Sequence, residues 1–137
     1  MKRVLFVCTG NSCRSQMAEG LLKHLGDERF EVFSAGTNPS TIHPLAIKAM
    51  QELEMDISGQ ASKGLAVFSG KAFDNLITVC DLARESCPVF PGGALPLHWS
   101  FEDPAGADGI EEERMGVFRR VRDKIRRQIE QFLDDSI

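Results

Sequence analysis

The sequence has no long apolar run and no excess of basic residues, and each absence excludes a class of protein. The first apolar run, residues 4–7, is followed at once by polar residues 9–12. It is too short for a signal peptide, and no other stretch is long enough to cross a bilayer. The formal net charge is −4, which argues against nucleic-acid and anionic-membrane partners, because both favour a basic surface. We therefore expect a cytoplasmic protein that binds neither nucleic acid nor membranes.

Repeats, low-complexity segments and linkers are also missing from the 137 residues. A chain of this length without a linker suits one domain, over residues 1–137, with one core. Four of its residues are cysteines. Because the cytoplasm keeps thiols reduced, we expect these cysteines to be catalytic, redox-active or metal-bound rather than structural disulfides.

Short apolar runs alternate with amphipathic segments along the chain. The runs predict strands at residues 4–7, 31–35, 75–80 and 95–99, and the segments predict helices at 15–25, 44–53 and 109–133. Pro96 indicates that the last strand lies at an edge, because proline cannot donate to a neighbouring strand. The predicted fold is α/β, a small four-stranded parallel sheet flanked by helices.

Three chemically active residues follow predicted strands. Cys8 comes after the first strand, Cys80 ends the third, and Asp103 lies in the loop after the fourth. Ligands of open parallel sheets bind at the carboxyl ends of the strands. We therefore expect these three side chains to meet at one edge of the sheet.

Residues 8–15, with the sequence Cys-Thr-Gly-Asn-Ser-Cys-Arg-Ser, join the first strand to the first helix. Gly10 and Asn11 tolerate positive φ, so this anion loop can curl and turn successive N–H groups inward. Such a nest at a helix N-terminus binds tetrahedral oxyanions. The predicted oxyanion-binding residues are Thr9, Gly10, Asn11, Ser12, Cys13, Arg14 and Ser15.

Within this loop, Arg14 can bond two oxygens of the anion through its planar guanidinium. Cys8 lies at the floor of the positive cup, which favours its thiolate form and makes it the candidate nucleophile. The hydroxyls of Ser15 and Thr9 can donate hydrogen bonds to that thiolate. The alternative is a structural loop that buries a thiol.

The loop resembles that of the low-molecular-weight protein tyrosine phosphatases, and the resemblance covers essentially the whole chain. In that family the first cysteine is the nucleophile, the arginine binds the oxyanion, and a late Asp-Pro supplies the general acid. Here Asp103-Pro104 stands at the expected place. An Asp-Pro alone more often marks only a turn; beside this loop, Asp103 is the predicted acid.

Two features differ from the phosphatases. Those enzymes follow Asp-Pro with aromatic residues, whereas Ala105-Gly106 follow it here and the chain has no tyrosine. Two further cysteines, Cys80 and Cys87, are also present, and a pair of thiols that closes to a disulfide supplies two electrons. Residues 8–19, 80–92 and 98–105 are similar to the thioredoxin-coupled arsenate reductases, a branch of the same fold.

The resemblance implies a mechanism for reducing arsenate to arsenite. Cys8 attacks arsenic, Asp103 protonates the departing oxygen, Cys80 attacks Cys8, and Cys87 then attacks Cys80. Thioredoxin reduces the resulting disulfide, Cys13 is not essential, and no organic cofactor is needed. Phosphate and sulfate are expected to compete with arsenate.

Some members of that family hold a potassium ion with residues that match Asn11, Glu19 and Ser34 and one acidic residue. Lys63 aligns at the acidic position, and its ammonium can replace the ion, so we expect no metal. A zinc site is disfavoured because the six-residue gap between Cys80 and Cys87 exceeds the usual spacing. Three readings stay open: Cys80 and Cys87 as small buried residues, a phosphatase of the same fold, or an oxyanion sensor switched by a disulfide.

Overall fold

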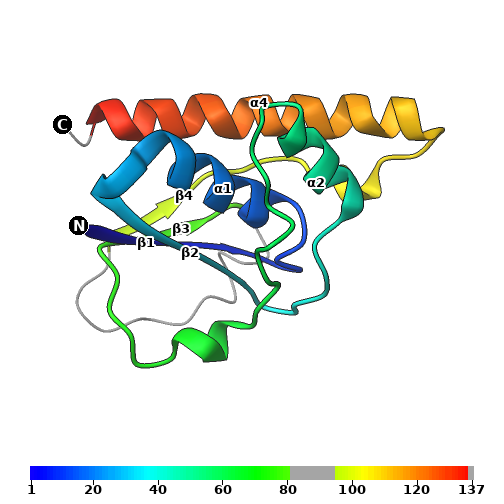
Figure 1. Ribbon diagram of the computed structural model, residues 1–137. Coiled ribbons are helices and arrows are strands. Elements are labelled where there is room, and N and C mark those ends of the chain that lie inside the picture. Colours follow the sequence, from blue (N-terminus) through cyan, green and yellow to red (C-terminus); the bar gives the residue numbers. More distant parts are fainter. Residues whose placement is uncertain (81–94, 136–137) are drawn as a thin grey trace.

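A four-stranded parallel sheet forms the centre of the computed structural model, which describes residues 1–80 and 95–135 (Figure 1). The strands are β1 (Lys2–Cys8), β2 (Phe30–Gly36), β3 (Asn75–Thr78) and β4 (Leu95–His98), in the order β2-β1-β3-β4. All three pairings are parallel. The α/β fold and the four-stranded parallel sheet predicted from the sequence are confirmed.

The central position of β1 explains its composition. Val4, Leu5, Phe6 and Val7 are all 0% exposed, as expected for a strand with neighbours on both edges and layers on both faces. β4 lies at an edge of the sheet, where the missing N–H of Pro96 does not deprive a second neighbouring strand of a hydrogen bond. β3 is shorter than predicted and ends at Thr78, although the Val79 N–H still donates to the Val7 carbonyl over 2.9 Å.

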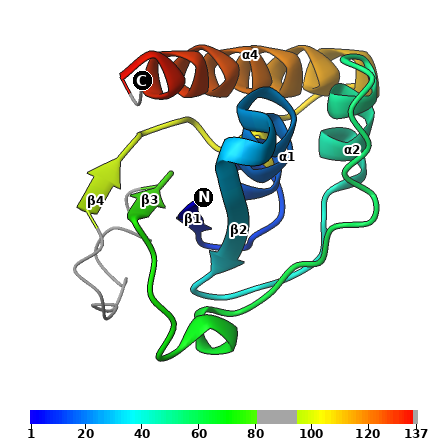
Figure 2. The same ribbon diagram turned by 60° about the vertical axis from the view of Figure 1, so that its left-hand side comes forward.

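Three α-helices are described: α1 (Arg14–Gly26), α2 (Pro44–Gln51) and α4 (Glu111–Asp135). Both ribbon views place them on one side of the sheet, with the short 3-10 helix η2 (Leu65–Phe68) on the other side (Figures 1 and 2). The buried face of α4 follows helical spacing and comprises Met115, Phe118, Val121, Arg122, Ile125, Ile129, Phe132 and Leu133. None of the described helices is long and apolar enough to span a membrane.

A polar contact fastens α4 to α2. Arg122, which is 8% exposed, donates over 2.8 Å to the Ala49 carbonyl and over 2.8 Å to Glu52. A buried guanidinium is tolerated only with such partners. This contact belongs to the helical layer and involves no residue of the anion loop.

Candidate active site

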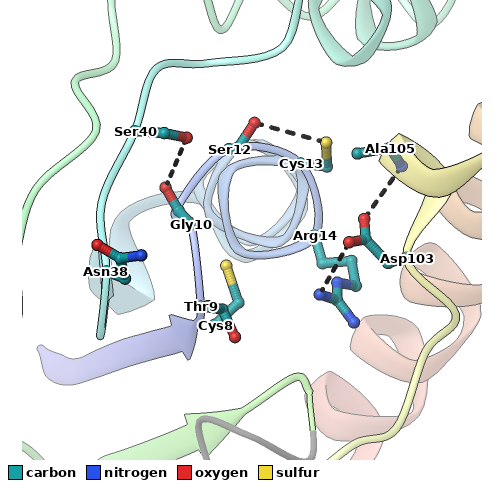
Figure 3. Close-up of a pocket in the computed structure, with 10 residues that line it drawn as sticks. All are labelled: Cys8, Thr9, Gly10, Ser12, Cys13, Arg14, Asn38, Ser40, Asp103 and Ala105. Carbon is teal, nitrogen blue, oxygen red and sulfur yellow. Dashed lines mark hydrogen bonds and ion pairs between the residues drawn. The ribbon is translucent and has the colours of Figure 1, made fainter.

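The carboxyl ends of the strands open onto a cavity of about 340 Å³ (Figure 3). Its lining residues are Cys8, Thr9, Gly10, Ser12, Cys13, Arg14, Asn38, Ser40, Asp103 and Ala105. The predicted nucleophile, arginine and acid therefore meet at one edge of the sheet. Asn38 and Ser40 were not predicted, although they too follow a strand, β2, at that same edge.

A ladder of hydrogen bonds shapes the anion loop from outside. The backbone N–H groups of Thr37, Asn38, Ser40 and His43 donate to the carbonyls of residues 8, 9, 10 and 12, over 3.1, 2.8, 2.9 and 3.1 Å. In a planar trans peptide the N–H points opposite to the C=O. Carbonyls that face residues 37–43 therefore turn the N–H groups of residues 9, 10, 11 and 13 the other way, as in the nests of N–H groups that bind anions in other proteins.

Asn11 makes the curl in this loop. Its φ is +48°, in the left-handed region that asparagine tolerates better than most residues. Gly10, for which the sequence suggested the same freedom, does not have positive φ. Asn11 is fully buried, and its side chain donates to Ser15 and Ser34 over 2.8 and 2.9 Å.

Two hydrogen-bond donors contact the Cys8 sulfur. The Asn11 N–H lies 3.2 Å from it and the Ser15 hydroxyl oxygen 2.7 Å from it. Because the Asn11 amide donates to the Ser15 oxygen, the Ser15 proton is free to point at the sulfur. Both contacts place a hydrogen-bond donor at the sulfur, and Cys8 itself is 2% exposed.

Thr9 has a different partner from the one expected. Its hydroxyl oxygen lies 3.3 Å from the sulfur of Cys80, rather than bonding to Cys8. Cys80 is 5% exposed, and its thiol is free. Cys8 thus carries the first predicted thiol, and Thr9, the next residue of the anion loop, contacts the second. Cys87, the third, lies outside the described residues.

Arg14 and Asp103 lie together at the mouth of the cavity. Arg14 donates to the Phe101 carbonyl over 3.1 Å, and its second terminal nitrogen is 3.7 Å from an Asp103 carboxylate oxygen (Figure 3). The other carboxylate oxygen accepts from the Ala105 N–H over 3.0 Å and caps the short 3-10 helix η3 (Pro104–Gly106). Asp-Pro is thus both a turn and a source of an exposed carboxyl above the cup.

Cys13 lines the same cavity but differs in chemistry. Burial raises the pKa of the Cys13 thiol to about 12, although its contact with Ser12 acts in the opposite sense. A thiol that holds its proton so firmly is a poor nucleophile at neutral pH. The expectation that Cys13 is not essential stays a prediction.

Lys63 lies close to Glu19, one of the residues that match the potassium site of some relatives. Asn11 donates to Ser34, Ser34 donates to Glu19 over 2.5 Å, and the Lys63 ammonium is 4.0 Å from Glu19. Burial lowers the pKa of Lys63, and Glu19 partly opposes that change. Within residues 1–80 and 95–135, no group of three or more His, Cys, Asp or Glu side chains is arranged to hold a metal ion.

Comparisons with known proteins agree with this geometry. Residues 3–137 match the family described as low molecular weight phosphotyrosine protein phosphatase. An arsenate reductase of Bacillus licheniformis is 47% identical over 134 residues, which cover 97% of this chain and 96% of that protein. A solved arsenate reductase in its phosphate-binding state is 37% identical, with a TM-score of 0.80 and coverage of 98% of both chains.

A third relative is the thioredoxin-dependent arsenate reductase of Corynebacterium glutamicum. It is 29% identical, with a TM-score of 0.74, and the match covers 98% of this chain and 60% of that one. The match to the family model and the full-length identity to arsenate reductases lead to one assignment. The chain belongs to the low molecular weight phosphotyrosine protein phosphatase family and, within it, to the arsenate reductases.

Proposed function

We propose that the protein reduces arsenate to arsenite through a relay of Cys8, Cys80 and Cys87 and is regenerated by thioredoxin. The observation that supports this most directly is the pairing of two thiols with one anion cup. Cys8 lies at the floor of the cup, and Cys80 contacts Thr9, the next residue along the chain. A hydrolase requires only the first of these thiols.

The first step uses the contacts of Cys8, Arg14 and Asp103. The inward N–H groups and the Arg14 guanidinium hold the oxygens of arsenate, and the Cys8 thiolate attacks arsenic. Asp103 gives its proton to the departing oxygen, which leaves as water. The product is a Cys8 thioester of arsenic(V).

The second step uses Cys80. Its thiolate attacks the Cys8 sulfur, the sulfur–arsenic bond breaks, and that electron pair remains on arsenic. Arsenic(III) leaves as arsenite and a Cys8–Cys80 disulfide forms. The Thr9 hydroxyl, 3.3 Å from the Cys80 sulfur, is placed to stabilise a negative charge there.

The third step restores Cys8. The Cys87 thiolate attacks Cys80, frees Cys8 and leaves a Cys80–Cys87 disulfide, which takes two electrons from a thioredoxin dithiol. The relative from Corynebacterium glutamicum is described as thioredoxin-dependent, which supports thioredoxin as the reductant. Cys80 is 5% exposed, so the disulfide has to move toward the surface before thioredoxin can attack it.

The lining of the cavity favours a small inorganic anion over phosphotyrosine. Within residues 1–80 and 95–135, no aromatic residue lines it, and Asn38, Ser40 and Ala105 form part of its wall. One solved arsenate reductase of similar structure is described in a phosphate-binding state, which supports phosphate as a competitor.

Arsenate-dependent oxidation of NADPH, in the presence of thioredoxin and thioredoxin reductase, tests the proposal. We expect wild-type protein to consume NADPH in proportion to the arsenate supplied, and Cys8→Ser to consume none. A wild-type protein that binds arsenate without NADPH consumption would instead be a disulfide-switched sensor. One that hydrolyses aryl phosphates but does not reduce arsenate would be a phosphatase, the second candidate, because Cys8, Arg14 and Asp103 suffice for that reaction.

A further inference from the structure

Gln16 is a fully buried amide and the third residue of α1, in the first turn of that helix. It is 0% exposed, which is unusual for a glutamine unless its polar atoms are paired. Its Nε2 donates over 3.1 Å to the Asn11 carbonyl and over 3.1 Å to the Ala61 carbonyl. Its Oε1 accepts from Gln60 over 2.7 Å. Every donor and the acceptor atom of this side chain is therefore used.

The first of these bonds completes the ladder around the anion loop. Residues 37–43 supply backbone donors for the carbonyls of Cys8, Thr9, Gly10 and Ser12 but none for that of Asn11. The Gln16 side chain takes their place at this one position. With it, each carbonyl from residue 8 to residue 12 points away from the cavity.

Fixing the Asn11 carbonyl has two effects on chemistry. Because the peptide is trans and planar, the outward carbonyl turns the Ser12 N–H toward the cavity, where an anion would bind. The same bond also constrains the backbone of Asn11, whose φ is +48° and whose own N–H lies 3.2 Å from the Cys8 sulfur. Gln16 thus acts on the anion and on the thiolate without touching either.

The other partners of Gln16 belong to a segment that supports the loop from behind. In residues 60–63, Gln60 contacts Gln16, the Ser62 hydroxyl donates to the Gly10 carbonyl over 3.1 Å, and the Lys63 N–H donates to the Asn11 side chain over 2.8 Å. Gln16 joins this segment to the loop because one amide nitrogen bonds to both.

We infer that Gln16 is a positioning residue that sets the anion affinity of the loop and the reactivity of Cys8. Its importance for arsenate reduction rests on the proposed function. Its effect on the loop does not, because the anion affinity and the reactivity of Cys8 can both be measured without turnover.

The test replaces Gln16 by methionine, which has a similar length and no N–H donor. Cys8 alkylation by iodoacetamide is followed by mass spectrometry of the Cys8 peptide, with and without inorganic phosphate. For Gln16→Met we expect alkylation at pH 7 to be about tenfold slower, its profile to move to higher pH, and protection to need about tenfold more phosphate. A tenfold change in rate and in phosphate affinity is roughly what the misplacement of one charge-assisted donor would cause.

Arg122→Met is the matched control. It also removes a buried side-chain bond to a backbone carbonyl, that of Ala49, but in the contact between α4 and α2. It should lower the unfolding temperature and leave the Cys8 alkylation rate and phosphate protection unchanged. Folding of each variant is checked by circular dichroism.

If Gln16→Met does not fold, Gln60→Met decides. The Gln60 amide donates to Oε1 of Gln16 over 2.7 Å and to the Gln16 backbone carbonyl over 3.1 Å. Its removal weakens the support of Gln16 and leaves the bond from Gln16 to Asn11 in place, so the same changes are expected at smaller size. A folded Gln16→Met or, failing that, Gln60→Met that keeps wild-type alkylation and phosphate protection would overturn the inference. A wild-type protein that does not reduce arsenate would overturn the proposed function instead and leave this result standing.

Discussion

Replacing Gly36 by alanine is expected to damage the active site without adding any polar or charged group. Gly36 is the last residue of β2 and pairs with Cys8. A Cβ at this position would lie 2.5 Å from the Thr9 carbonyl oxygen and 2.9 Å from the Asn11 nitrogen. Both are backbone atoms of the anion loop, so no side-chain rotation relieves the overlap.

The size of the effect follows from the distance. Ordinary contact begins near 3.4 Å, so the loop and Gly36 must separate by roughly 0.9 Å. A misplacement of about 1 Å at a catalytic group costs about 10²-fold in rate, which is about 2.7 kcal/mol in the barrier. Overpacking of this kind also costs about 1–3 kcal/mol of stability. We expect kcat/KM for arsenate to fall about 100-fold and phosphate protection of Cys8 to weaken with it.

Two other glycines separate this effect from general destabilisation. At Gly116, in α4, a Cβ meets nothing within 4 Å, so Gly116→Ala should keep activity and raise stability by about 0.5–1 kcal/mol. At Gly20 a Cβ meets the Ile57 and Met50 side chains at 2.6 and 3.2 Å. Gly20→Ala should therefore lower the unfolding temperature and leave kcat/KM nearly unchanged. Wild-type kcat/KM and phosphate protection in Gly36→Ala would refute the reasoning.

Three further changes give distinct outcomes. Arg14→Lys keeps the charge but loses the planar two-nitrogen contact, so kcat/KM for arsenate should drop about 100-fold in steady-state assays; a drop below threefold would contradict an oxyanion role. Cys80→Ser should stop thioredoxin-coupled turnover and preserve aryl phosphate hydrolysis, whereas equal loss of both would mean that the thiol is structural. Burial lowers the pKa of His43, whose neutral ring nitrogen accepts from the Leu45 N–H. The stability that this cap supplies is present above pH 6.5, where the unfolded histidine is neutral too, and is lost as pH falls below it. The free energy of unfolding, measured with urea, should therefore decline less between about pH 7 and pH 5 in His43→Asn than in the wild type, whereas the exposed control His24→Asn should decline like the wild type. Equal pH dependence in His43→Asn and the wild type would exclude the cap.

The sequence predicted those parts of the site that depend on local order along the chain. The apolar run of β1, the polar loop after it and the amphipathic α1 placed Cys8 and Arg14 correctly, because strand-loop-helix connections are read from neighbouring residues. Asp103 followed from its position after a strand. The convergence of Cys8, Cys80 and Asp103 then followed from the parallel order of the sheet.

What the sequence did not predict depends on contacts between distant residues. The donors of Asn38 and Ser40, and the bonds of Gln16 to residues 60–61, join segments that no periodic pattern relates. The partner of the Thr9 hydroxyl depends on a side-chain rotation, since Cys8 and Cys80 are both near. Gly36 directly follows the predicted strand at residues 31–35, and no sequence pattern marks it, because the anion loop comes close to it only in the folded sheet.

The bonds that shape the anion loop also set when the site comes into being. Ser62 and Lys63 are each 52 residues from the loop atoms that they hold, and closing such long chain loops costs entropy that local contacts do not repay. A chain emerging from the ribosome with only β1, α1 and β2 would contain Cys8 and Arg14 but not the donors that curl the backbone between them. The arrangement of hydrogen-bond donors around Cys8 is therefore a late product of folding, and an incompletely synthesised chain lacks it.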